Sequence, residues 1–303
     1  MQRVSGKMAP QMFGLVDGAA SPGKIQPLLE QSKSAFVSVY EGLPEEQAGA
    51  ASLFLVRIDN PMAPWAHELD QIDLHSPCLV LIWSDVELSD LAAHLRAFLF
   101  ADIGDGMTAM VRYFDPRNTG AVFRVWGEQL RNMFMAPIEQ LKYRGRSEEW
   151  LTVSNRSEEA RRVSRSVVVR FDQQDIDALT AHTEPDHLMA SLTDLGYIDE
   201  ARPYRERFLD FEPRYQRALD WGLVETRDRL AYCDFAYRYG DGFDREASIR
   251  DALDARRRNA ESFENAMHRV PARVWRALKH ARQAEGRAVG SQDAAHEQAA
   301  AWR

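Results

Sequence analysis

Residues 78–100, CLVLIWSDVELSDLAAHLRAFLF, hold a short apolar run followed by an amphipathic segment, and this pair decides the fold class. Cys78–Trp83 is continuously apolar, which is typical of a strand buried on both faces. In Leu88–Phe100 the apolar side chains fall on one helical stripe, with Asp90 and Arg96 off it. A strand followed directly by such a helix predicts a sheet that is covered by helices.

The rest of the first half alternates between the same two kinds of element. Further strands are predicted for four β-rich runs: Met12–Val16, Ala35–Tyr40, Leu53–Ile58 and Met107–Phe114. Helices are predicted for Ile25–Gln31, Pro64–Leu74 and Ala121–Phe134, the last broken near Gly127. Pro27 is expected to restrict the first of these helices to an initial turn. Asp105-Gly106 predicts a tight turn before the fourth strand.

The second half is different in character. Residues 144–165 are polar and charged, and we interpret them as the connection between two domains, residues 1–150 and 151–303, with a strand near Trp150–Val153. After Ser166–Phe171, a last strand or the entry to the second domain, the pattern is helical throughout: Asp175–Ala181, Asp186–Leu195, Pro203–Trp221, Thr226–Tyr239, Arg245–His268 and Ala272–Gln283. Residues 284–303 form a weak helix or a disordered tail. The predicted fold is therefore an α/β lobe, with a mixed sheet and flanking helices, followed by an all-α lobe.

Composition excludes several classes of protein. The 303 residues include 38 basic and 46 acidic side chains, a net charge of −8 that argues against a general nucleic-acid binder. No apolar run approaches the roughly 20 residues of a membrane span, and the first ten residues lack the apolar core of a signal peptide. Cys78 and Cys233 both lie in apolar runs, as reduced core cysteines do. We therefore expect a cytoplasmic protein without nucleic-acid or membrane partners.

One motif resembles a phosphate-binding loop. Residues 18–25, GAASPGKI, match Gly-x4-Gly-Lys but carry Ile25 where a hydroxyl is needed to hold magnesium. Pro22 also removes one of the amides that would bind phosphate. We interpret the segment as a turn between strand and helix. A nucleotide-binding enzyme that uses this loop, with Lys24, is the alternative.

Other motifs for catalysis or metal binding are incomplete. His67-Glu68 begins like the helix of a zinc protease, but Gln71 stands where the second histidine belongs. His182 and His187 flank two carboxylates without a thiolate or a third histidine nearby. His94 is expected to be solvated or to cap its helix. We predict no catalytic residue, no metal site and no cofactor.

The densest polar cluster is RYFDPR, residues 112–117. If the preceding strand runs through it, alternation places Arg112 and Phe114 on one face and Val111 and Tyr113 on the other. An arginine among apolar residues needs a partner, and Asp115 or a loop carbonyl would supply it. The cluster is therefore interpreted as a structural clamp in which Arg117 holds the turn.

These residues and their order resemble the bacterial type VI secretion adaptor-chaperone family, long catalogued as a domain of unknown function. The similar segments, which span about residues 12–141, are Leu15–Ala19, Ser38–Gly42, His94–Leu99, Asp105-Gly106, Arg112–Arg117, Gln129-Leu130 and Phe134–Ile138. The helical half shows a spacing that is common in the family: Ala218, Trp221-Gly222-Leu223, Asp228, Tyr232, Tyr239-Gly240 and Phe243. Tyr113-Phe114 inverts the usual aromatic order, and Met135-Ala136 replaces Phe-Gly.

The resemblance implies an adaptor and not an enzyme. Members of the family bind a type VI secretion effector in the cytoplasm and load it onto the VgrG spike, in some cases through a PAAR tip. A structural component of the secretion apparatus is a further alternative. It is expected to assemble without any effector.

Two lobes joined by a polar segment would form a cleft for the partner protein, anchored by aromatic and arginine side chains. The candidate partner-binding residues are Tyr40, Trp83, Arg96, Arg112, Asp115, Arg117 and Phe134 in the first lobe and Tyr232, Tyr237 and Arg238 in the second. The competing interpretation places most of these aromatic residues in the core. Arg112 and Asp115 are expected to hold the fold more than to touch the partner.

Overall fold

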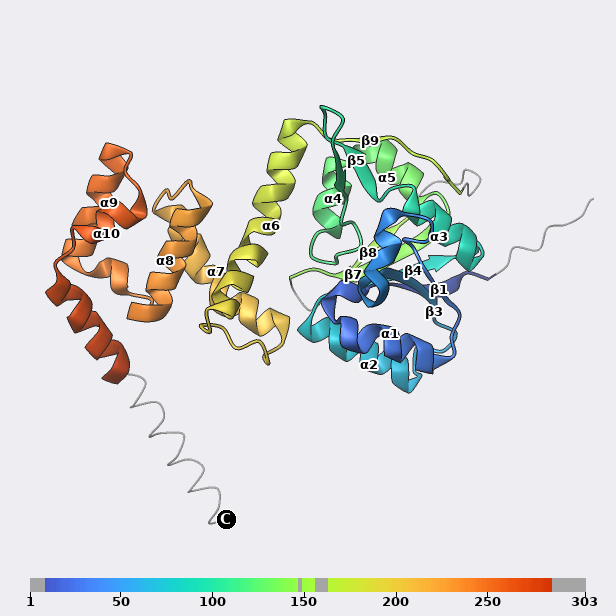
Figure 1. Cartoon of the computed structure of the whole chain (residues 1–303), viewed down its shortest axis with the longest axis horizontal. Helices are drawn as coiled ribbons and strands as arrows, with labels where there is room; N and C mark the ends of the chain where they lie inside the picture. The colour runs from blue at the N-terminus through green and yellow to red at the C-terminus, as the bar shows by residue number, and fades with distance from the viewer. Residues whose placement is uncertain (1–8, 147–148, 156–162, 285–303) are drawn as a thin grey trace, which may run out of the picture. The chain divides into compact units, whose positions relative to one another are not determined.

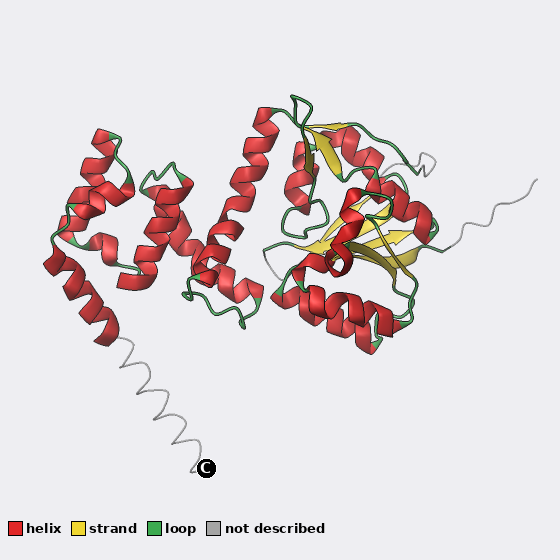
Figure 2. Ribbon diagram, viewed as in Figure 1, coloured by secondary structure: helices red, strands yellow, loops and turns green. Residues whose placement is uncertain are grey.

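The computed structural model describes residues 9–146, 149–155 and 163–284 and divides the chain into two compact units. Met1–Thr183 with Ala201–Glu206 forms the first unit, and Glu184–Glu200 with Arg207–Arg303 forms the second. Every strand among the described residues belongs to the first unit, which extends past residue 150, whereas the described part of the second unit is built from helices (Figure 1 and Figure 2). The predicted fold class, an α/β lobe followed by a helical lobe, is confirmed.

A six-stranded antiparallel sheet is the centre of the first unit. Its strands, in spatial order, are β2 (Phe36–Ser38), β3 (Leu53–Arg57), β1 (Gln11–Asp17), β4 (Leu79–Ser84), β7 (Ile138–Arg144) and β8 (Trp150–Ser154). The chain thus places β4, the strand from which the prediction began, between β1 and β7. Burial on both faces is incomplete there, because Leu81 and Trp83 are only half-buried.

Strand alternation supplies two hydrophobic cores, one on each face of this sheet. In β1, Phe13 and Leu15 join one core, whereas Val16 joins the other. The larger core lies beneath α3 (Leu88–Arg96), α4 (Thr119–Val125) and α5 (Gly127–Met135).

The smaller core packs against α1 (Pro22–Ser32) and α2 (Pro64–His75), which lie side by side in Figure 1. Pro27 lies inside α1, because the helix begins at Pro22 and not near Ile25 as predicted. The missing amide of Pro27 therefore falls in the second turn.

A second, three-stranded sheet corrects two predictions. It consists of β6 (Thr108–Met110), β5 (Phe100–Asp102) and β9 (Val169–Arg170), and Asp105-Gly106 turns between β5 and β6 with φ of 51° and 72°. The predicted helix Leu88–Phe100 therefore ends early, and its last residue begins β5. The predicted strand Met107–Phe114 stops at Met110, so the expected alternation of side chains beyond it is wrong.

The second unit is a set of helices around its own core. They are α6 (Gln173–Asp194), shared with the first unit, then α7 (Tyr204–Asp220), α8 (Thr226–Tyr239), α9 (Ala247–Asn259), α10 (Phe263–His268) and residues 272–284. The two helices predicted before and after Pro185 are one helix, and Pro213 likewise lies within α7. The predicted helix Arg245–His268 is divided, because Ala260 adopts a left-handed conformation at φ 49°. Most of the predicted tail, residues 285–303, lies outside the described residues.

Short 3-10 helices complete the described chain at Gly18–Ala20, Pro44–Ala51 and Phe243–Arg245. Cys78 and Cys233 are buried free thiols, as predicted. In the described part of the chain, no helix has both the length and the apolar character that are needed to cross a membrane.

Gly18 is the position where a side chain is least tolerable. A Cβ there would lie 2.5 Å from the carbonyl oxygen of Ser52 and 2.6 Å from that of Ala50, whereas at Gly23 it would meet nothing within 4 Å. We predict that Gly18→Ala lowers the free energy of unfolding by about 1–3 kcal/mol. Gly23→Ala, the matched control, should leave it unchanged or raise it by up to about 1 kcal/mol. Urea denaturation measures both, and equal effects would contradict the close approach.

Candidate functional site

Asp115 is the centre of a charged cluster in the turn between β6 and α4. Arg117 places its guanidinium on both carboxylate oxygens, with Nε 2.9 Å from Oδ1 and Nη2 2.8 Å from Oδ2. The backbone N–H of Arg117 donates to Oδ1 at 3.0 Å, and the amide of Asn118 donates to Oδ2 at 3.2 Å. Asp115 is only 3% exposed, a depth at which a carboxylate is tolerated because it is paired. The Asp-Pro-Arg turn is a clamp, as the sequence indicated.

Arg112 extends this cluster to the end of β1. Its Nη2 lies 2.8 Å from Oδ2 of Asp17 and 3.8 Å from Oδ2 of Asp115. Burial raises the pKa of Asp17, and the charge of Arg112 opposes that rise. The guanidinium also lies 5.4 Å from the ring centroid of Phe114. Sequence reasoning missed Asp17 as the partner, although an aspartate that ends a buried strand was an available signal.

Both aromatic rings of the RYFDPR cluster are buried in the larger core of the first unit. Tyr113 and Phe114 are each 1% exposed, because the turn that replaces the predicted strand directs both inward. The hydroxyl of Tyr113 donates to the carbonyl of Leu95 at 2.7 Å. Thr119 at the start of α4 donates to the carbonyl of Tyr113 at 2.8 Å. These bonds tie the charged turn to α3 and α4.

Tyr40 and Arg96 join the end of β2 to its neighbours. Nε of Arg96 donates to the carbonyl of Val39 at 2.8 Å, and its Nη2 lies 3.6 Å from Glu41. The hydroxyl of Tyr40 lies 3.6 Å from Sδ of Met110. Burial, with a smaller contribution from Asp17, raises the pKa of Tyr40 to about 12. The side chains therefore link α3, β2 and β6.

His94 is buried and not solvated, which corrects the prediction. Its Nε2–H donates to the carbonyl of Phe134 at 2.8 Å, while Nδ1 accepts from the backbone N–H of Ser164 at 2.9 Å. Burial lowers the pKa of His94 to about 4, so the ring is neutral at pH 7. The imidazole thus ties α3 to α5 and to the segment before β9.

Phe134 is the hub of an aromatic cluster. Its ring centroid lies 5.0 Å from that of Tyr113, 5.2 Å from those of Phe98 and Trp126, and 5.5 Å from that of Phe123. Phe134 is 0% exposed. It shapes the first unit from inside and offers no surface to a partner, which corrects its prediction as a contact residue.

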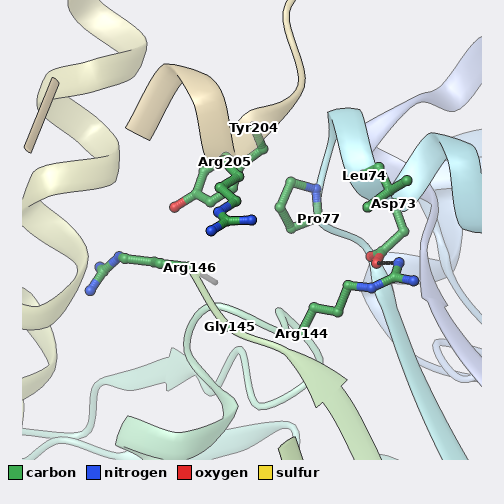
Figure 3. Close-up of a pocket in the computed structure, with 8 residues that line it drawn as sticks. All are labelled: Asp73, Leu74, Pro77, Arg144, Gly145, Arg146, Tyr204 and Arg205. Atoms are coloured by element: carbon green, nitrogen blue, oxygen red, sulfur yellow. Dashed lines mark hydrogen bonds and ion pairs between the residues drawn. The ribbon is translucent and has the colours of Figure 1, made fainter. Parts of the chain in front are cut away.

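A small hollow of about 20 Å³ in the first unit is rimmed by arginines (Figure 3). Arg144 points at Asp73, 2.8 Å away, and also lies 2.6 Å from Asp70, whereas Arg146 extends in the opposite direction and donates to the carbonyl of His182. The guanidinium of Arg144 is stacked 4.2 Å from the ring centroid of Trp150. Both terminal nitrogens of Arg144 therefore hold β7 to α2.

Trp83 lies on β4 beside β7, where Nζ of Lys142 stands 5.3 Å from its ring centroid. Half-buried as it is, the ring is a candidate contact on this part of the sheet. Its role stays a prediction.

The three predicted residues of the helical unit differ in accessibility. Tyr232 is 0% exposed and donates to Oδ2 of Asp244 at 2.6 Å, so it is a core residue and its prediction as a contact is wrong. Tyr237 donates to Asp210 at 2.7 Å and is half-buried. Arg238 is exposed and donates to the hydroxyl of Tyr197 at 2.6 Å.

The ten predicted residues thus fall into two groups. Tyr40, Asp115, Phe134 and Tyr232 are buried supports. Six retain accessible surface: Trp83, Arg96, Arg112, Arg117, Tyr237 and Arg238. Arg112 is the accessible member of the charged cluster that combines a 48% exposed side chain with a buried ionic anchor.

Most backbone amides of the loop at residues 18–25 already donate hydrogen bonds within the protein. The N–H of Gly18 donates to Ser52 at 2.9 Å, and that of Ala19 donates to Asp17 at 3.1 Å. The N–H groups of Lys24 and Ile25 both donate to the carbonyl of Ser21 at 3.0 Å. A phosphate cradle needs such donors to be available, so this use of the amides counts against the nucleotide-binding alternative.

Residues 9–146, 149–155 and 163–284 contain no candidate metal site. Within them, no group of three histidine, cysteine or acidic side chains is placed to hold a metal ion. Nε2 of His182 donates to the carbonyl of Arg117 at 2.9 Å. Glu184 accepts from Tyr215 at 2.7 Å and pairs with Arg229. His182 and Glu184, two of the four members of the predicted cluster, are thus in structural contacts.

Residues 12–132 match a family described as a domain of unknown function, DUF4123. This segment runs from β1 into α5 and includes the whole charged cluster. No curated protein and no solved structure matched the chain.

Alanine substitutions at Phe134 and at its neighbour Met133 test the role of Phe134 as the hub of the aromatic cluster. Phe134→Ala should lower the free energy of unfolding by about 3–5 kcal/mol, because it leaves a cavity among five rings. Met133→Ala should change it by less than about 0.5 kcal/mol, since Met133 is 40% exposed. Chemical denaturation separates the two, and a Phe134→Ala protein as stable as the Met133→Ala protein would contradict the assignment.

Because His94 is buried as a neutral ring, we predict that the folded protein loses stability in acid. The unfolded chain binds a proton at this histidine below about pH 6.5, whereas the folded chain binds it only near pH 4. The free energy of unfolding should therefore fall by up to about 3 kcal/mol between these pH values. In His94→Asn that component should vanish, while the exposed His67→Asn control should keep it. Denaturation midpoints at pH 7 and pH 4.5 measure the fall in the free energy of unfolding. An identical fall in the wild type, His94→Asn and His67→Asn would contradict the contribution of His94.

Proposed function

We propose that this chain is an adaptor that binds a type VI secretion effector in the cytoplasm and loads it onto the VgrG spike, in some cases with a PAAR tip. The chain acts by protein–protein contact and performs no chemistry of its own. Its closest support is the match of residues 12–132 to the DUF4123 domain, together with the resemblance of the same segments to secretion adaptors.

One structural observation carries the proposal further. The segments that bear the resemblance are far apart in sequence, yet their side chains bond to one another. Asp17 pairs with Arg112, Arg96 bonds to Val39, and His94 bonds to Phe134. A prearranged scaffold of this kind lowers the entropic cost of binding a large partner.

Arg112 is the member of this scaffold best placed to meet the partner. Its guanidinium is fixed between Asp17 and the ring of Phe114, and its side chain remains 48% exposed. Arginine is enriched at the energetic centres of protein interfaces because its planar group forms several directed hydrogen bonds.

Exposed methionines suit a surface that accommodates another polypeptide. Met62 is 86% exposed and Met107 is 54% exposed. The flexible, polarisable side chain of methionine is common at binding surfaces that adapt to partners. The alternative of a structural component in the secretion apparatus predicts assembly without an effector, so co-purification distinguishes it.

Co-expression with an effector encoded nearby tests the proposal. We expect the full chain and the effector to elute together from a sizing column in a defined ratio. Arg112→Ala should lower the stability of the first unit, because it leaves the buried carboxylate of Asp17 without its partner, and should weaken the complex by about tenfold or more. The exposed Arg131→Ala on α5 is the matched control and should leave the complex intact.

The outcomes separate the parts of the proposal. If the wild-type chain retains neither effector nor spike protein, the adaptor function is refuted. If Arg112→Ala is folded and binds as the wild type does, the role of Arg112 is refuted and the function stands. A thermal unfolding scan of each variant establishes that the fold is intact.

A further inference from the structure

A pocket of about 370 Å³ opens on the second unit, and none of the ten predicted contact residues lines it. Its lining comes from α8, α10 and the helix of residues 272–284. One water molecule occupies about 30 Å³ of liquid, so the pocket has room for several side-chain groups. Ligand-binding pockets in proteins begin at about this size.

Aromatic rings form one wall of the pocket. The ring centroid of Trp275 lies 5.2 Å from that of Phe235, at an interplanar angle of 80°, and 4.8 Å from that of Tyr239. All three rings are only half-buried, although each belongs to the edge of the hydrophobic core of this unit. Rings left partly open around an unfilled volume form a surface that gains free energy when it is covered.

Carboxylates are the main ionisable groups of the pocket lining. Its lining includes the carboxylates of Asp234 and Glu264 together with His268, and it includes no lysine or arginine. Arg238 holds Oδ1 of Asp234 at 2.9 Å. Glu264 is the more available carboxylate, since its side chain is 66% exposed and its contact with His268 is a long one of 3.9 Å.

Aromatic faces and a carboxylate together select a cation. The electron-rich faces of tryptophan, tyrosine and phenylalanine attract ammonium and guanidinium groups, and a nearby carboxylate adds a charge-assisted hydrogen bond. The apolar floor, which includes Met267, suits the methylene stem that such a side chain carries.

We propose that this pocket receives an arginine or lysine side chain, flanked by apolar residues, from a segment of the partner protein. The inference rests on the proposed function, because the partner is the protein that the adaptor carries. It identifies a second contact site, on α8, α10 and residues 272–284, with its own chemical preference.

Short random peptides displayed on phage, selected on the full chain, test this preference directly. The selected peptides should share a basic residue next to an aromatic or aliphatic one. A fluorescently labelled peptide from the selection should bind Glu264→Lys at least tenfold more weakly than the wild type, and Glu264→Gln should show an intermediate loss. Glu212→Lys, an exposed acid on α7 of the same unit, is the matched control and should bind within twofold of the wild type.

Selected peptides without a basic residue would overturn the inference, and so would equal affinity for the wild type and Glu264→Lys. Glu264 is exposed in the first turn of α10, so both of its variants should retain the fold, which circular dichroism checks. The same proteins and peptides also test two other occupants of the pocket, a second copy of the chain and the chain's own last residues. Concentration-dependent dimerisation abolished by Glu264→Lys would assign the pocket to a second copy, and peptide binding seen only after removal of residues 285–303 would assign it to the chain itself.

The effector complex separates this inference from the proposed function. If the wild-type complex forms and Glu264→Lys leaves its affinity unchanged, the pocket is refuted as a contact site while the adaptor function stands. If no complex forms with the wild type but the peptides bind as expected, the function is refuted and the preference of the pocket stands.

Discussion

The first unit depends on one buried carboxylate and the two arginines around it. Asp115 is 3% exposed, and its charge is stable there because Arg117 forks onto both oxygens and Arg112 stands 3.8 Å away. Arg112 reaches in turn to Asp17, which follows the buried residues of β1. A turn after β6 is thereby fixed to the central strand of another sheet, across 95 residues of sequence.

The rest of the unit is organised around this fixed turn. Once the chain turns at residues 112–119, the rings of Tyr113 and Phe114 face the larger core, and α4 begins at Thr119. The neutral imidazole of His94 and the aromatic hub at Phe134 then join α3 to α5. The first unit is therefore a preorganised frame that exposes Arg112 without a conformational change. Preorganisation of this kind favours binding of another protein.

Local patterns allowed most of the elements to be predicted from the sequence. Strands β1, β3 and β4 and helix α2 follow hydrophobic periodicity, and α8 begins and ends where Thr226 and Gly240 indicate. The errors come from contacts that local patterns do not contain. The strand predicted through Phe114 ends at Met110 because Asp115 draws the chain into a turn, and Pro185 is tolerated within a helix that tertiary packing supports.

The candidate site was predictable in chemistry but not in geometry. The need of Arg112 for an anion was evident, and Asp17 at the end of a buried strand was an available signal, but the pairing of the two depends on the order of strands in the sheet, which no local pattern contains. Phe134 and Tyr232 were expected at a surface because large aromatic residues anchor interfaces and cores alike. The pocket beside Trp275 was not foreseen, since it arises where three helices meet.

Hydrogen–deuterium exchange of the full chain, alone and bound to its co-expressed effector, tests most directly whether the frame exists before binding. The account predicts that the bonded amides within residues 112–119 exchange as slowly in the free chain as in the complex, because they already donate to Val111, Arg112 and Asp115. New protection should appear only at the outer surfaces. Rapid exchange of residues 112–119 in the free chain, with protection only in the complex, would contradict a prearranged frame.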